Sequence, residues 1–155
     1  MSCLWLHPFS MNSTAMAAVS YEPVTPEPVN PAGFAKWFDG KDGVSAGNLR
    51  KTVRLLKYVR DYHGRFDIPS VVLAVLVAGR VRRWDDCWLR YRDLPTAFTT
   101  LVDRTNTLVQ GFPEPPRIPD PSCPSADFSG RLGGPEWSRF RSSFNQYAGT
   151  VSEAF

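Results

Sequence analysis

The stretch Leu49–Gly79, LRKTVRLLKYVRDYHGRFDIPSVVLAVLVAG, decides the fold because it places a basic helix directly before an uncharged segment. In the basic part, apolar residues recur at helical spacing and cover one broad arc. From Val71 to Ala78 every residue is apolar, which predicts a helix enclosed by protein on all sides. A strand is the alternative because of the valines, but the proline start at Pro69 and the length of the segment favour a helix.

A shorter helix is predicted before this stretch, over NPAGFAKWFDG. Asn30 can cap it, Pro31 suits its first turn, and Gly40 is the predicted end. Its aromatic residues share one face and are expected to dock on the core: Phe34, Trp37 and Phe38. Ser45 is the predicted cap of the basic helix, which should run to about His63.

Two more helices are predicted after the apolar segment, so the fold class is all-α with about five helices. The first is DLPTAFTTLVDRTNTLVQ, capped by Asp93, and the second opens near Pro135. The second carries an aromatic stripe: Trp137, Phe140, Phe144, Tyr147 and Val151. Between them lies a proline-rich segment, expected to be a surface connector. The pattern assigns no element to residues 82–92.

The domain plan follows from length and composition. A chain of 155 residues with 43% hydrophobic residues suits one domain with a real core. Residues 1–28, with recurring prolines and no period, are expected to form an irregular or disordered arm, and residues 29–155 the helical domain.

Several function classes find no support in the sequence. Three distant cysteines and two histidines provide no zinc-ligand spacing, and an odd cysteine count argues against a disulfide framework. The longest apolar run is far shorter than the ~20 residues of a membrane span. The N-terminus lacks the basic region and the sustained apolar run of a signal peptide. A soluble, cytoplasmic protein with no membrane partner and no metal site of its own is the expectation.

The basic helix suggests an anionic partner. Six of the 18 Lys and Arg residues lie between Arg50 and Arg65, although the formal net charge is only +3. Arg50, Arg54 and Lys57 follow the i, i+4, i+7 spacing that forms one row, a candidate contact for phosphate or nucleic acid. Arg60 projects into the apolar arc and is expected to form a structural ion pair.

The order of these features resembles one family. The quoted helices, followed by PEPPRIPDPSCPSADFSGRL and an aromatic helix, are similar to the C-terminal helical half of nucleotidyltransferases of the oligoadenylate synthase and cyclic GMP–AMP synthase type. The bacterial branch, which makes cyclic oligonucleotides in anti-phage signalling, has the most similar pattern. The resemblance covers roughly residues 29–155.

The resemblance implies that the catalytic half is missing. Family members bind ATP or GTP with Mg²⁺ through a Gly-Ser turn and a D-x-D pair in a sheet-containing half. This chain has no Gly-Ser pair and no acids spaced as D-x-D or E-x-D. No catalytic residue is therefore assigned, and the chain is expected to be inactive alone. It reads as a piece cut at both ends: a gene remnant, a mis-started reading frame, or one half of a split enzyme whose other half is a separate partner.

The resemblance also implies two triphosphate contacts, Lys57 in VRLLKYVRD and Ser70 at the head of IPS. Lys57 lies at the border of the basic and apolar faces, and Ser70 lies beside free first-turn amides, which suits phosphate. We expect weak nucleoside triphosphate binding, and self-association through the uncovered docking face. The alternative is a non-enzymatic helical module whose basic helix binds nucleic acid or a protein partner.

Overall fold

The computed structural model describes residues 30–64, 66–83 and 87–155, and it confirms the all-α prediction of about five helices. Five helices have nine or more residues: α1 Pro31–Val44, α2 Asn48–His63, α3 Ser70–Ala78, α5 Leu94–Gln110 and α6 Gly134–Ala154. A four-residue helix, α4 Cys87–Arg90, lies in the stretch to which the sequence assigned no element. The arm expected at residues 1–28 lies outside the described residues.

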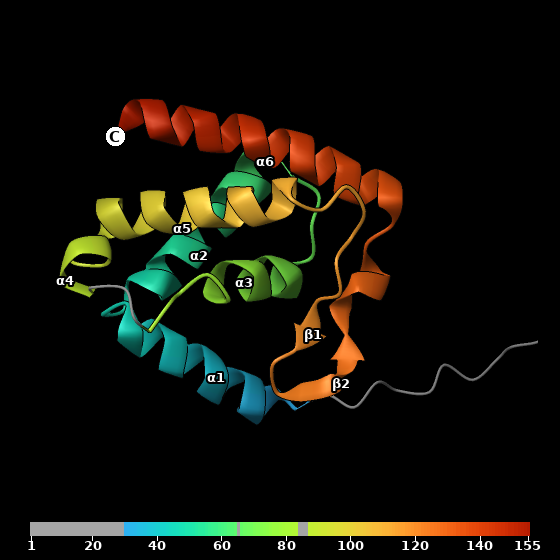
Figure 1. Ribbon diagram of the computed structural model, residues 1–155, viewed down its shortest axis with the longest axis horizontal. Helices are drawn as coiled ribbons and strands as arrows, with labels where there is room; N and C mark the ends of the chain where they lie inside the picture. The colour runs from blue at the N-terminus through green and yellow to red at the C-terminus, as the bar shows by residue number, and fades with distance from the viewer. Residues whose placement is uncertain (1–29, 65, 84–86) are drawn as a thin grey trace, which may run out of the picture.

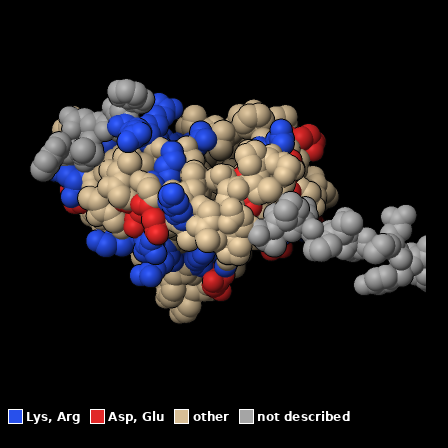
Figure 2. Space-filling view, turned by 90° about the horizontal axis from the view of Figure 1, so that it is seen from below, with Lys and Arg blue, Asp and Glu red and all other residues tan. Residues whose placement is uncertain are grey.

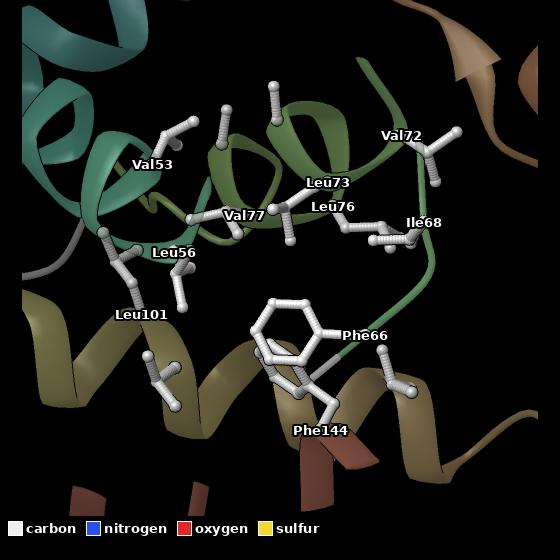
Figure 3. Close-up of a cluster of buried hydrophobic side chains, with 14 of the residues drawn as sticks. Val53, Leu56, Phe66, Ile68, Val72, Leu73, Leu76, Val77, Leu101 and Phe144 are labelled. Atoms are coloured by element: carbon white, nitrogen blue, oxygen red, sulfur yellow. The ribbon is translucent and has the colours of Figure 1, made fainter. Parts of the chain in front are cut away.

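Helix α3 is at the centre of the molecule, as its uninterrupted apolar sequence predicted. Figure 1 shows α1 below it and α5 and α6 above it, with α2 passing behind α5. Six of its nine residues are buried, and Val71 and Val75 are partly exposed, so the enclosure is nearly complete. Its side chains meet Leu56 of α2, Leu101 of α5 and the loop residue Phe66 in one core cluster (Figure 3). Each buried aliphatic side chain contributes about 1.5–3 kcal/mol to folding.

The aromatic stripe of α6 closes the core from the other side. Trp137, Phe140 and Phe144 are fully buried, and Phe66 packs edge-on against Phe140 and Phe144 with ring centroids 6.1 and 5.5 Å apart. Such ring pairs each add about 0.5–1.5 kcal/mol beyond the buried area. Phe66 thereby anchors the loop between α2 and α3, which fixes where the N-terminus of α3 begins.

Two predicted caps are present, and one predicted helix end is wrong. The side chains of Asn30 and Asp93 accept hydrogen bonds from the amides of Gly33 and Thr96, at 2.9 and 2.8 Å. Helix α1 does not end at Gly40 but continues to Val44, because an interior glycine costs a helix only about 1 kcal/mol and does not end it by itself. The half-buried aromatic side chains of α1 pack against the core as expected: Phe34, Trp37 and Phe38.

The proline-rich segment is more ordered than predicted. It forms an antiparallel pair of strands, β1 Pro119–Asp120 and β2 Cys123–Asp127, and then a 3₁₀ turn, η1 Phe128–Arg131. The buried carboxylate of Asp120 accepts hydrogen bonds from the amide and hydroxyl of Ser122, at 2.7 and 2.6 Å, which stabilises the turn between the strands. The predicted surface connector therefore contains a strand pair and a 3₁₀ turn that the sequence did not indicate.

The length and hydropathy of the helices bear on the membrane prediction. Within the described ranges, no helix is both long enough and apolar enough to cross a bilayer.

Candidate anion-binding surfaces

Helix α2 presents its basic residues to the outside because its apolar face is held in the core. Leu49, Val53 and Leu56 are buried, whereas Arg54 is exposed and Lys57 is partly exposed. Gly64, with φ at +57°, ends the helix in the left-handed conformation that favours glycine. The predicted basic face of this helix is exposed, but the predicted apolar arc is only partly buried, because Leu55 and Tyr62 remain exposed.

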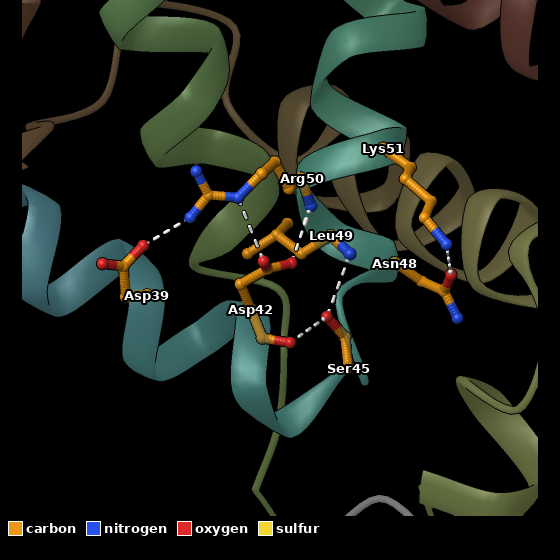
Figure 4. Close-up of polar contacts among 7 residues, drawn as sticks. All are labelled: Asp39, Asp42, Ser45, Asn48, Leu49, Arg50 and Lys51. Atoms are coloured by element: carbon orange, nitrogen blue, oxygen red, sulfur yellow. Dashed lines mark hydrogen bonds and ion pairs between the residues drawn. The ribbon is translucent and has the colours of Figure 1, made fainter.

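Arg50, the first cation of the predicted row, is already neutralised by carboxylates of the preceding helix. Its Nε donates to Asp42 at 3.2 Å, and its Nη2 forms an ion pair with Asp39 (Figure 4). Asp42 also accepts a hydrogen bond from the Arg50 amide at 2.9 Å, and so caps the N-terminus of α2. The hydrogen bonds from Asp42 and then Asp39 raise the pKa of the Arg50 guanidinium. Arg50 thus joins α1 to α2. Its guanidinium is already paired with two carboxylates and is not available to an external anion.

Ser45 shares this capping role, although α2 begins two residues later than it would if Ser45 were its N-cap. Its hydroxyl accepts a hydrogen bond from the Leu49 amide at 2.9 Å and donates to the Asp42 carbonyl at 3.0 Å. Ala46 and Gly47 then adopt positive φ values, so the chain turns before α2 starts at Asn48. The two helices meet in a tight, fully hydrogen-bonded corner.

Arg60 has the partners expected of a half-buried guanidinium. Its Nε lies 2.7 Å from the carboxylate of Asp61, and its Nη1 donates to the Ile68 carbonyl at 3.0 Å. The hydrogen bond from Arg60 is the main cause that lowers the pKa of Asp61, and the charge of Lys57 adds to it. Arg60 therefore ties the end of α2 to the loop that leads into α3.

Lys57 and Arg54 remain available on the outer face of α2. Within the described ranges, neither side chain has a hydrogen-bond or ion-pair partner. Lys57 is close enough to Asp61 to influence its titration, but the two do not form a bridge within 4.0 Å. Arg54 and Lys57 are thus the free cations of the predicted row.

Ser70 is exposed at the first position of α3. Pro69 precedes it, and no side chain caps the amides of the first turn. These amides and the positive end of the helix dipole are therefore available to an anion. Neither Ser70 nor Lys57 lines any of five hollows found among the described residues.

An exposed apolar stripe runs along α2 beside these cations. Leu55, Tyr58 and Tyr62 have exposed fractions of 42%, 58% and 71%, and they follow the i, i+3, i+7 spacing of one helix face. The two tyrosine rings stack with centroids 5.3 Å apart. Two of these residues belong to the arc that the sequence predicted as apolar, and the structure leaves them uncovered.

The sequence pattern did not indicate a second cationic region, at the other end of α3. Lys41, Arg80 and Arg117 come from segments far apart in the chain and line one hollow of about 400 Å³. No spacing rule relates these residues, so only the folded chain brings them together. Figure 2, which views the molecule from the α1 side, shows Lys and Arg side chains spread over this face with fewer Asp and Glu.

A metal site is not apparent in the part of the chain that the structure describes. There, no group of three or more His, Cys, Asp or Glu side chains is arranged to hold a metal ion.

Comparisons with protein-family models, with curated proteins and with solved structures found no match to this chain.

Proposed function

We propose that this chain is a nucleotide-contacting helical half of a nucleotidyltransferase of the oligoadenylate synthase and cyclic GMP–AMP synthase type, and that it does not catalyse on its own. The bacterial enzymes of this type, which make oligonucleotide signals in anti-phage defence, are the branch we favour. The order of the sequence motifs supports the proposal, and the helices they predicted are present. The metal ligands and the triphosphate turn belong, on this proposal, to a separate sheet-containing half.

One observation supports the proposed ligand best: the uncapped first turn of α3 carries the exposed hydroxyl of Ser70. Side chains cap the first turns of α1, α2 and α5, whereas α3, like α6, has no such cap, so the free amides of α3 can donate hydrogen bonds to a phosphate oxygen. Lys57, on the neighbouring α2, has an ammonium group without a bridge to a carboxylate. Hydrogen bonds to charged groups contribute about 1.5–3 kcal/mol each.

The exposed stripe on α2 is the surface we assign to the missing half. Leu55, Tyr58 and Tyr62 offer a contiguous apolar row that soluble monomers usually cover. Without the partner half, this row should pair with a second copy of the chain. The expected self-association is therefore part of the same proposal.

The non-enzymatic alternative, a module that binds nucleic acid through the basic row, is less well supported. It requires Arg50, Arg54 and Lys57 together, but Arg50 is held by Asp39 and Asp42. Two free cations neutralise too few phosphates for strong duplex binding, since affinity rises with each contact.

The test is an NMR titration of the full chain with ATP and with AMP. We expect ATP to bind in the millimolar range, because only half of the cleft is present, and to bind better than AMP. Lys57→Ala and Ser70→Ala should each weaken ATP binding toward the AMP level. Arg54→Ala is the matched control, since it removes a free cation of the same helix without affecting the proposed contacts. Equal shifts with ATP and AMP, or ATP binding that survives Lys57→Ala, would reject the proposal.

A further inference from the structure

A hollow at the C-terminal end of α3 combines an apolar lining with three cationic side chains. It has a volume of about 400 Å³ and lies between α1, α3, the end of α5 and the proline-rich segment. Its apolar lining includes Trp37, Leu108 and Phe112, and its polar side chains are all cationic: Lys41, Arg80 and Arg117. None of the described residues that line it is acidic.

The three cations differ in how far they are neutralised. Arg117 lies 3.8 Å from a carboxylate oxygen of Asp127, so part of its charge is balanced. Lys41 donates a hydrogen bond to the Val81 carbonyl at 3.1 Å, which orients the ammonium group but does not neutralise its charge. Arg80 has no acidic partner among the described residues, and its Nε is buried without a hydrogen-bond acceptor. A half-buried guanidinium without a counter-ion is costly, because burial disfavours the charged form.

The surroundings of Arg80 increase this positive potential. Arg80 also lines a neighbouring hollow of about 280 Å³ together with Arg82 and Arg104. Burial first, and then the nearby charge of Arg82, lower the pKa of Arg80. Lys41 and Trp37 line a third hollow, of about 360 Å³, with Arg83. Arg80 therefore lies between the first hollow and the second, and Lys41 between the first and the third.

We propose that this hollow binds a small amphipathic organic anion, whose apolar ring or chain lies on Trp37, Leu108 and Phe112 and whose acidic group is held by Arg80 and Lys41. The volume lies within the usual range for small-molecule sites, about 300–1,000 Å³, and a few polar groups in an apolar lining are typical of such sites. Charge complementarity selects an anion, since every charged side chain in the described lining is positive. The bound acid supplies the counter-ion that Arg80 lacks among the described residues.

This site is separate from the triphosphate contacts proposed above. Ser70 is the first residue of α3, whereas Arg80 lies beyond its last residue, Ala78, so the two sites are at opposite ends of this nine-residue helix. Neither Lys57 nor Arg54 lines the hollow. The two proposals can therefore fail independently.

The experiment compares three probes on the full chain by isothermal titration calorimetry and by the indole N–H signal of Trp37 in NMR. 1-Naphthyl phosphate has both the ring and the anion, 1-naphthol has the ring alone, and inorganic phosphate has the anion alone. We expect the first to bind at least about tenfold more tightly than either other probe, because both parts of the site are engaged. Similar affinity for 1-naphthol or for inorganic phosphate would overturn the proposal.

Variants locate the site. Arg80→Gln should weaken 1-naphthyl phosphate about tenfold or more, the loss expected for one charge-assisted hydrogen bond. Phe112→Glu should weaken the binding of 1-naphthyl phosphate by a similar factor, and it should not disturb the core because Phe112 is 42% exposed. This variant tests the site if Arg80→Gln does not fold. Arg54→Gln and Lys57→Ala should change the affinity less than twofold. Full affinity in Phe112→Glu, or equal losses in Arg54→Gln and Arg80→Gln, would refute the assignment.

Discussion

Replacing Thr105 by valine should stabilise the protein. Thr105 lies on the buried face of α5 with no exposed surface, and its hydroxyl has no hydrogen-bond partner within the described ranges. Thr52, on the adjacent helix α2, is in the same situation. A buried hydroxyl that loses its water and gains no partner lowers the stability of the folded state.

The magnitude follows from the unpaired hydroxyl alone. Valine replaces that hydroxyl with a methyl group of similar volume, and threonine and valine have similar helix propensities, so packing and propensity nearly cancel. Relieving an unsatisfied buried hydroxyl should raise the free energy of unfolding by about 1–3 kcal/mol. For a domain of this size, 1 kcal/mol corresponds to a rise in Tm of roughly 3–5 °C.

Thermal and urea unfolding, followed by circular dichroism, can measure the change. Thr107→Val is the matched control, because Thr107 is exposed two residues further along α5 and donates to the Asp103 carbonyl at 3.0 Å. That substitution should change stability by less than about 0.5 kcal/mol. A Thr105→Val protein that is less stable than the wild type would show that the hydroxyl has a partner after all, and the reasoning would be wrong.

Three further predictions concern chemistry, association and acid stability. Purified chain with ATP or GTP and Mg²⁺ should release no pyrophosphate in a coupled assay, because no D-x-D pair is available to hold two metals; activity that persists after careful purification would contradict this. Tyr62→Lys should shift the chain toward monomer in sedimentation experiments, since it places a charge in the exposed α2 stripe; the reverse shift would exclude this stripe. Burial acts to raise the pKa of Asp127, but the amides of Ser129 and Ile118 outweigh it and hold that pKa below its usual value. The ionised Asp127 carboxylate therefore stabilises the fold above about pH 4, and this stabilisation is lost as the pH falls through the lowered pKa of the folded state. Asp127→Asn should reduce the dependence of the free energy of unfolding on pH below about pH 4. An unchanged dependence in that range would count against this role of Asp127.

The sequence by itself determined the helices and their buried faces. Periodicity placed the stripe of α6, the caps Asn30 and Asp93 set two helix starts, and a segment without polar residues placed α3 at the centre. These features depend on neighbours within about one helical turn, and local chemistry decides them. The division of α2 into a core face and a basic face follows from the same rule.

Only the tertiary structure decided which charges are free and where they meet. Arg50 looked like an anion contact in its own helix, but Asp39 and Asp42 of another helix neutralise it. The cations Lys41 and Arg80 are 39 positions apart in the chain and converge at one hollow because α1 and α3 pack together. Helical periodicity reports which face of an element is buried, but the partner of a charge depends on how distant elements are brought together in three dimensions.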